Sequence, residues 1–173
     1  STNWAVFNSI SGPTKWMVLN NTYGDLDATG GSNQWNSTSP TNSVFSIGNT
    51  TSTNINDEDF IAYAWHSVPG FSKIGSYSGG NTGSSNIIVT GFEPKFIIVK
   101  CITASTAEDW LIFDSTRGNA LTFVNHLRAS TSENESTFNR QINFVNNGFY
   151  WGVTEAGVNS SGRTYIYMAF AHR

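Results

Sequence analysis

The sequence predicts an all-β protein whose antiparallel strands form a β-sandwich of the jelly-roll type. Many short segments of the 173 residues are rich in aromatic and β-branched side chains, and Gly, Asn, Ser and Thr bound them. Turn signals separate these segments by roughly 8–12 residues, a spacing typical of β-sandwiches and jelly rolls. No segment carries an apolar stripe of helical period over three turns, and only Thr103–Asp109 is expected to form a turn of helix.

The first part of the chain carries four of the expected strands. Trp4–Phe7 and Trp16–Leu19 are short runs that each begin with a tryptophan, and Val44–Ile47 is a third run between polar stretches. Phe60–Trp65 lacks clean alternation of apolar and polar residues. Because a strand without alternation is typically covered on both faces, we expect Phe60–Trp65 to be a central strand of its sheet.

The rest of the chain carries seven more expected strands. Phe96–Ile102 is a long apolar run that holds the single cysteine, Cys101, which we expect to be a buried hydrophobic side chain. Tyr165–Ala171 also lacks alternation over most of its length and is expected to be a central strand covered on both faces. The remaining expected strands are Lys73–Tyr77, Asn86–Val89, Trp110–Phe113, Leu121–Leu127 and Phe149–Val153.

The composition excludes several classes of protein. Charged residues make up only 12% of the sequence, whereas serine, threonine and asparagine account for 61 residues and aromatic residues for 14%. A disordered chain would be rich in charge and poor in aromatic residues, so that class is excluded. The nine Lys and Arg residues are dispersed and the net charge is −3, so we expect no nucleic-acid partner. No apolar run approaches the roughly 18 residues of a membrane span, so we expect no membrane insertion.

The sequence contains an internal repeat with a spacing of 104 to 106 residues. Asn3–Gly12 aligns with Asp109–Gly118, so that Trp4 corresponds to Trp110. Further matches keep the same order: Phe45 with Phe149, Gly48 with Gly152, Ile61 with Ile166, Ala64 with Ala169, and Trp65 with Phe170. Aromatic and glycine positions kept in order over some sixty residues indicate two copies of one β-rich unit.

The repeat divides the chain into a partial first copy, residues 1–67, and a complete second copy, residues 68–173. The second copy opens with the segment Phe71–Ile102, for which the first copy has no counterpart, because the first copy starts at the stage of Trp4. We therefore expect the first copy to be truncated from a longer polypeptide. The alternative is that the two copies pack as one sandwich and need no further strands.

Aromatic side chains near loops are the candidates for ligand binding. Trp35 precedes a polar loop that begins at Asn36. β-Sandwich lectins bind sugars by stacking them on an exposed aromatic ring beside amide groups. We therefore expect Trp35 and Asn36 to contact a ligand, and packing in the core or at a subunit interface is the alternative for Trp35.

No metal site, catalytic residue or cofactor is predicted. Carboxylate oxygens of Asp57 and Asp59 could hold calcium, but a turn before a central strand explains these residues as well. The corresponding loop around Asn159 carries no carboxylate, which favours the turn. Asp25 and Asp27 form a carboxylate pair that glycoside hydrolysis could use, and this pair is the enzyme alternative.

Several motifs resemble a module of bacteriophage structural proteins: Phe60–Trp65, Val68–Gly79, Val89–Lys100, Asp109–Asp114 and Asn159–Phe170. The module recurs, often in tandem, in tail-fibre-like virion proteins of aquatic and marine phages, and it is largely catalogued as a domain of unknown function. The resemblance covers Phe60–Arg173 well and Trp4–Trp65 more loosely. None of its motifs is a catalytic signature.

The resemblance implies a β-rich protein of the virion surface and does not imply a reaction, and we expect the protein not to be an enzyme. We expect a tail-fibre or receptor-binding module that contacts host-surface carbohydrate. By analogy with other fibres, we expect it to assemble with other virion proteins as a homo-oligomer, specifically a trimer. The alternatives are a capsid-decoration or head-fibre structural protein and a secreted lectin-like adhesin, and a depolymerase enzyme comes last.

Overall fold

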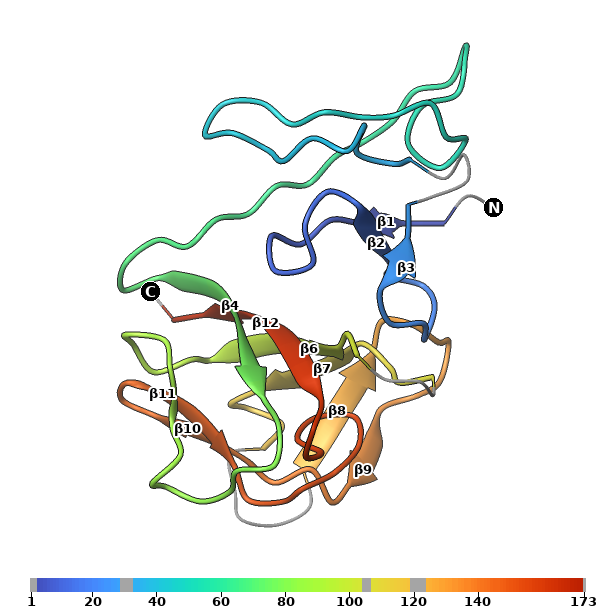
Figure 1. The fold of residues 1–173 in the computed structure, drawn as a ribbon. Coiled ribbons are helices and arrows are strands. Elements are labelled where there is room, and N and C mark those ends of the chain that lie inside the picture. Colours follow the sequence, from blue (N-terminus) through green and yellow to red (C-terminus); the bar gives the residue numbers. More distant parts are fainter. Residues whose placement is uncertain (1–2, 29–32, 104–106, 119–123, 173) are drawn as a thin grey trace.

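The computed structural model describes residues 3–28, 33–103, 107–118 and 124–172 (Figure 1). These residues form twelve strands and no helix, and all named strand pairs are antiparallel. The strands make three sheets, whose orders are β1-β2-β3, β10-β11-β5 and β4-β12-β6-β7-β8-β9. The predicted all-β class and sandwich architecture are thereby confirmed.

The six-stranded sheet is the larger layer of the sandwich. Its interior strand β12 pairs along its length with the edge strand β4 on one side and with β6 on the other. Tyr165, Tyr167 and Ala169 of β12 are buried on one face of the sheet, and Ile166 is buried on the other. The predicted central position of this segment is confirmed. The strands of the sheet are β4 (Ser72–Ser78), β6 (Phe96–Cys101), β7 (Leu111–Asp114), β8 (Val124–Arg128), β9 (Ser136–Phe138) and β12 (Thr164–Phe170).

The second layer is the small sheet of β10 (Ile142–Val145), β11 (Gly148–Trp151) and β5 (Ile88–Val89). Its side chains pack against the six-stranded sheet in an aromatic core that includes Phe149 and Trp151 from this layer and Phe113 from β7. Cys101 lies in the same core with no exposed surface, as expected. The buried residues of this cluster all come after residue 91. The second part of the chain therefore builds the sandwich.

The N-terminal sheet consists of β1 (Ala5–Val6), β2 (Lys15–Val18) and β3 (Leu26–Asp27). It packs on the outer face of the six-stranded sheet through a second, smaller cluster formed by Met17, Ile102, Trp110 and Ile166. The indole N–H of Trp110 donates a 2.9 Å hydrogen bond to the carbonyl oxygen of Val18. Met17 and Trp110 therefore anchor the N-terminal sheet to the sandwich.

Lys100 provides a polar link in the same place. Its ammonium group is fully buried and donates to the carbonyl oxygens of Thr22, at 3.0 Å, and of Glu108, at 2.7 Å. Burial lowers the pKa of Lys100 to about 8, because the charged form loses its hydration. The two carbonyl oxygens replace part of that hydration and tie the loop after β2 to the sandwich.

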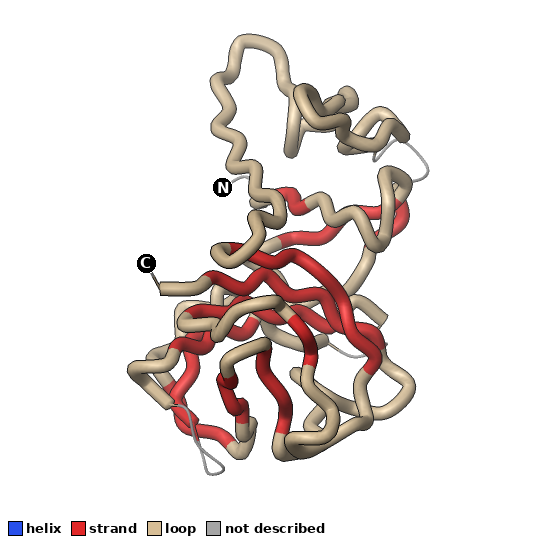
Figure 2. Tube along the Cα trace, turned by 90° about the vertical axis from the view of Figure 1, so that its left-hand side faces the viewer, coloured by secondary structure: helices blue, strands red, loops and turns tan. Residues whose placement is uncertain are grey.

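Two of the strand predictions for the first part of the chain are wrong. Val44–Ile47 and Phe60–Trp65 form no strand, and the latter runs as a long connection toward β4 (Figure 1). Phe60–Trp65 was predicted to be buried on both faces, yet Ile61 is 72% exposed and Tyr63 63% exposed. The physical reason is that no strand of the described chain lies beside this segment to cover it. Figure 2 shows the resulting contrast between the loop-rich upper part and the strand-rich lower part.

The other differences concern shorter segments. β3, β9 and β10 were not predicted, because their sequences are short or polar and lack a strong strand signal. Of Leu121–Leu127, residues 121–123 lie outside the described residues, and the rest falls in β8. Residues 104–106 of the expected helical turn also lie outside, and 107–109 are not helical. The repeat and the division at residue 67 stay predictions.

Candidate functional site

Among the residues that the structure describes, the exposed large apolar side chains are unevenly distributed, and all but Ile87 and Val89 belong to residues 4–65. We call this set the exposed apolar surface. Soluble monomers seldom leave many large apolar side chains in water, so such a set indicates contact with another molecule. Its members are Trp4, Ile10, Tyr23, Val44, Phe45, Ile47, Ile55, Phe60, Ile61, Tyr63 and Trp65.

Three rings of this surface form an aromatic ladder, which consists of Trp4, Tyr63 and Trp65. The ring centroids of Trp4 and Tyr63 are 6.2 Å apart with their planes 29° from parallel, and those of Tyr63 and Trp65 are 5.9 Å apart at 22°. Each ring is at least half exposed. The ladder links the start of β1 to the segment Phe60–Trp65, and its outer faces are open to a partner.

A second feature is a groove of about 500 Å³ at the outer edge of β4, which we call the edge groove. It lies between β4 and the segment that leads into β5. Its lining combines amide and hydroxyl groups with apolar side chains: Ser76, Tyr77, Ser78, Asn81, Ser85, Asn86, Ile87, Ile88, Val89, Asn159 and Tyr167. This mixture of polar rim and apolar wall suits a ligand that carries both kinds of surface.

The backbone of β4 contributes hydrogen-bonding groups to the edge groove. The N–H of Ser72 donates to the carbonyl oxygen of Val68 at 2.9 Å, and the N–H of Ile74 donates to the hydroxyl oxygen of Ser67 at 3.0 Å. Even-numbered residues of β4 therefore turn their backbone groups away from β12. Since this alternation continues along an antiparallel strand, the N–H and C=O groups of Ser76 and Ser78 point toward the edge groove.

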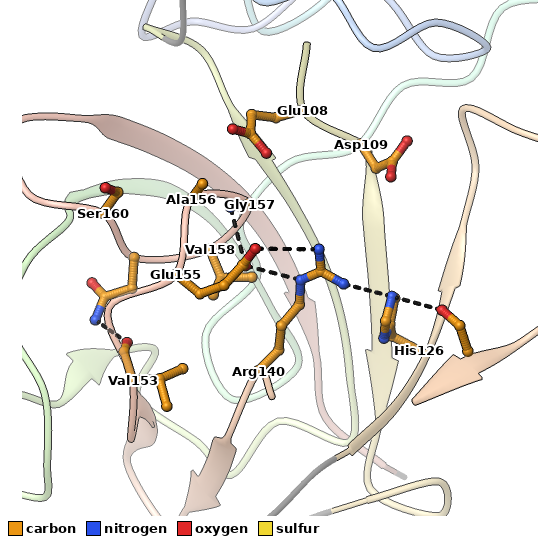
Figure 3. Close-up of polar contacts among 12 residues, drawn as sticks. Glu108, Asp109, His126, Arg140, Val153, Glu155, Ala156, Gly157, Val158 and Ser160 are labelled. Carbon is orange, nitrogen blue, oxygen red and sulfur yellow. Dashed lines mark hydrogen bonds and ion pairs between the residues drawn. The ribbon is translucent and has the colours of Figure 1, made fainter. Parts of the chain in front are cut away.

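The charged network inside the sandwich joins four residues (Figure 3). Nε of Arg140 donates to a carboxylate oxygen of Glu155 at 2.9 Å, and Nη1 of Arg140 donates to Nε2 of His126 at 2.7 Å. Because a guanidinium only donates, Nε2 is the acceptor and the His126 ring is neutral. The hydroxyl of Ser136 lies 3.1 Å from the same nitrogen.

The environment of this network indicates a structural role. His126 has no exposed surface and Arg140 is 7% exposed. Burial, followed by the positive charges of Arg140 and Arg128, lowers the pKa of His126 to about 4. The buried neutral ring and the ion pair connect β8, β9, the segment between β9 and β10, and the loop before β12. Neither the imidazole nor the guanidinium faces the edge groove.

The residues expected to bind a ligand occupy different environments. Trp35 is only 9% exposed: its ring meets Phe7 edge-to-face at 5.8 Å, and its indole N–H donates to the carbonyl oxygen of Lys15 at 3.0 Å. The expectation of an exposed, sugar-stacking Trp35 is therefore corrected in favour of core packing. Asn36 is exposed, with a φ of 50°, and belongs to the following turn.

None of the four acidic candidates lines the edge groove. Asp57 and Asp59 are exposed, and Asp57 has a φ of 63°, as in a tight turn. No group of three or more His, Cys, Asp and Glu that could hold a metal ion occurs among the described residues. Asp27 pairs with Lys15 on the surface, while burial raises the pKa of Asp25. The two carboxyl groups differ in burial, although the charges of Lys15 and Asp27 both act on Asp25.

Sequence reasoning missed the edge groove. The serines of β4 carry no sequence signal that they border a groove. Which edge of a sheet is free depends on the order of its strands, and that order follows from tertiary pairing.

No helix that could cross a membrane occurs in the described parts of the chain.

Comparison with known proteins identifies one matching protein family. A family model described as "Domain of unknown function (DUF7483)" matches residues 1–173, the whole sequence. No curated protein and no solved structure matches the chain significantly.

Proposed function

This chain belongs to the DUF7483 family of domains of unknown function, and we propose that it is a non-catalytic module of a phage virion surface protein. The module is of the tail-fibre or receptor-binding type and contacts carbohydrate on the host surface. What supports the virion assignment is the resemblance of Val68–Gly79, Val89–Lys100 and Asn159–Phe170 to tail-fibre-like modules.

The single observation that carries the carbohydrate proposal is the chemistry of the edge groove. Amide and hydroxyl groups of Asn81, Ser85 and Asn86 line it, and the backbone of Ser76 and Ser78 adds donors and acceptors. Sugar hydroxyls need such groups, while the C–H faces of a sugar ring pack on apolar walls such as Ile87. A volume of about 500 Å³ is sufficient for one or two sugar residues.

A glycan array probed with the labelled chain tests this proposal. We expect a restricted set of glycans to bind, and Ser85→Arg, at a position that lines the edge groove, to reduce binding at least about tenfold by filling the groove. Ser132→Arg introduces the same side chain at an exposed position outside the groove and serves as the matched control. Absence of any bound glycan, or equal binding by the two variants, would contradict the carbohydrate proposal.

A second candidate is a capsid-decoration or head-fibre protein, and the exposed apolar surface favours it. Eleven large apolar side chains of residues 4–65 are exposed, which suits contact with other virion proteins or with copies of the same chain. Cryo-EM of the intact particle distinguishes the two candidates. Density at a tail-appendage tip, with the edge groove facing outward, supports receptor binding, whereas density over the capsid lattice supports the decoration role.

A further inference from the structure

The N-terminal sheet has the same strand arrangement as one half of the six-stranded sheet. β1-β2-β3 is an antiparallel series of three consecutive strands, and so is β7-β8-β9. Ala5 and Leu111, which correspond in the repeat, each lie opposite a residue of the next strand, Val18 and Arg128 respectively. The two series therefore begin at matching positions of the sequence.

The loops that follow also share their hydrogen bonds. The N–H of Gly48 donates to the carbonyl oxygen of Gln34 at 2.8 Å, and the N–H of Gly152 donates to that of Gln141 at 2.7 Å. Gly48 and Gly152 are repeat partners in the sequence. A Cβ added to Gly48 would clash with the backbone carbonyl oxygen of Asn33, whereas one added to Gly152 would meet the flexible side chain of Gln141, so only Gly48 requires a glycine on this ground.

Asn54 and Asn159, 105 positions apart, repeat a more specific pattern. The backbone N–H of each donates to the carbonyl oxygen four residues earlier, at 2.8 Å for Asn54 and 2.7 Å for Asn159. The side-chain amide of each also donates to the carbonyl oxygen six residues earlier, in Gly48 at 3.0 Å and in Val153 at 2.9 Å. Two hydrogen bonds with the same sequence separations indicate the same local fold.

The two asparagines differ in what lies next to them. The amide of Asn159 also donates to the carbonyl oxygen of Asn81 at 2.7 Å, and its side-chain oxygen accepts from the N–H of Gly80 at 3.1 Å. These contacts hold the loop that follows β4. The loop belongs to the opening segment of the second copy, which has no counterpart in the first, and Asn54 is exposed.

The same difference explains why Phe60–Trp65 forms no strand and is exposed. Its counterpart in the repeat lies in β12, between β4 and β6, where Tyr165 has no exposed surface. Both of those neighbours come from the opening segment, so Phe60–Trp65 lacks both. Phe60, the counterpart of Tyr165, is accordingly 45% exposed.

We infer that residues 3–67 form an incomplete copy of the domain built by residues 68–172, and that the exposed apolar surface docks two strands equivalent to β4 and β6. The occupant is a polypeptide segment with the sequence pattern of Phe71–Ile102. The β6 equivalent would lie between Phe60–Trp65 and β1, and the β4 equivalent on the other side of Phe60–Trp65. This inference does not depend on the proposed virion function.

The geometry favours such a segment over a second copy of the chain. In a second copy, β4 and β6 already pair with β12 over seven and six residues, so supplying them would require that sheet to open. Inserting a strand separates its two neighbours to roughly 10 Å, since adjacent strands lie about 4.8 Å apart. The rings of Trp4 and Tyr63 are now 6.2 Å apart, so docking must open the aromatic ladder.

The test supplies the missing strands by fusing a copy of residues 68–106 directly before Ser1 of the full chain. This join keeps the sequence spacing that the second copy has between residue 106 and Trp110, because Trp4 is the counterpart of Trp110. We expect hydrogen exchange of the amides of residues 60–65 to slow by at least about 100-fold, as in a paired central strand. Tryptophan fluorescence should shift to shorter wavelength as Trp4 and Trp65 become buried.

The matched control is the same fusion with Ile97→Asp and Val99→Asp in the added copy only, because both side chains are fully buried in the resident β6. This control should leave exchange of residues 60–65 as fast as in the chain alone. A synthetic peptide of residues 68–106, added to the intact chain, provides a second measurement if the fusion aggregates. Unchanged exchange and fluorescence in both formats overturns the inference, as does protection in the unfused chain that rises with its own concentration, which would make a second copy the occupant.

Discussion

The two parts of the molecule use similar sequence patterns with opposite results. In residues 68–172, β12 pairs on both sides and its apolar side chains are buried in two clusters. In residues 3–67, Phe60–Trp65 has an equally apolar sequence but forms no strand and lies exposed. The difference teaches that a buried central strand is a property of its neighbours, because only they supply the backbone partners and cover both faces.

The two parts also differ in how they are stabilised. The sandwich has its own aromatic core, in which Tyr77 stacks on Tyr165 at 5.1 Å and Trp151 meets Phe113 edge-to-face at 5.5 Å. The fully buried members of the second cluster include only one residue of the N-terminal part, Met17. We therefore expect the sandwich to govern the overall stability and the N-terminal part to follow it.

The largest expected effect comes from Trp110→Ala compared with Trp4→Ala, two residues that correspond in the repeat. Trp110 is 6% exposed and its indole bonds to Val18, so its removal leaves a cavity between the two parts and an unpaired carbonyl oxygen. We expect Trp110→Ala to lower the free energy of unfolding by about 4 kcal/mol. Trp4 is half exposed, and Trp4→Ala should lower it by about 1 kcal/mol or less.

Urea unfolding followed by circular dichroism measures both changes in the free energy of unfolding. Trp110→Phe is a useful intermediate variant, because it keeps an aromatic ring at this position and removes the indole N–H together with part of the ring volume. Equal losses of stability for Trp110→Ala and Trp4→Ala would show that the two tryptophans have equivalent surroundings, which contradicts the comparison.

Acid sensitivity should be confined to the sandwich, where His126 is buried and neutral. The pKa of His126 is about 4 in the folded state and about 6.5 when unfolded, so the unfolded state binds a proton more readily. The associated stability is therefore complete above pH 6.5 and is lost as the pH falls toward 4, by about 3 kcal/mol in all. Arg140 adds to this effect, because it cannot donate to a protonated Nε2.

Unfolding by urea at several pH values between 7 and 4.5 measures this loss for the chain and for His126→Gln. The variant should show a flatter dependence on pH over that interval, since other groups that titrate are unchanged. His66→Gln alters an exposed histidine of the N-terminal part and should leave the dependence as it is. If His126→Gln keeps the full acid sensitivity, another group must be responsible.

The sequence predicted the strands that carry strong local signals. Phe96–Ile102, Trp110–Phe113 and the segment around Tyr165 are rich in aromatic and β-branched residues, and all appear as strands within one or two residues. β10 was not predicted, because Ile142–Val145 has a polar residue in a short run and depends on its pairing with β11. The error at Phe60–Trp65 has the opposite cause, since its local signal is strong and its partners are lacking.

The candidate sites were less predictable than the strands. Trp35 was expected on the surface because it precedes a polar loop, yet Phe7 and the backbone of Lys15 hold it in the interior. The edge groove is formed by the outer side of β4 and by residues 81–89, segments brought together by tertiary packing. Neither the order of strands nor a free sheet edge can be obtained from periodicity, because both depend on pairings distant in sequence.

The smallest expected effect distinguishes Asn159→Ala from Asn54→Ala. The buried Asn159 amide donates to the carbonyl oxygens of Asn81 and Val153, and its removal leaves both of them short of a donor. The N–H of Gly80 loses the side-chain oxygen but keeps its hydrogen bond to the backbone carbonyl oxygen of residue 159. We expect Asn159→Ala to lower the free energy of unfolding by about 2–3 kcal/mol. Asn54→Ala removes one side-chain hydrogen bond at the surface and should lower it by about 0.5–1 kcal/mol.

Thermal and urea unfolding of the two variants measure this difference, and repeating the measurement in the fused chain makes it sharper. If the strands supplied by residues 68–106 complete the first copy, the Asn54 side chain should hydrogen-bond to the added loop, as the Asn159 side chain does to the loop after β4. The effect of Asn54→Ala should then rise toward that of Asn159→Ala. The effect of Asn54→Ala could instead stay at its original value while the amides of residues 60–65 become protected from exchange. The added strands would then pair with Phe60–Trp65 without reproducing the loop contacts of the second copy. The two parts would in that case be equivalent in their sheets and not in their loops.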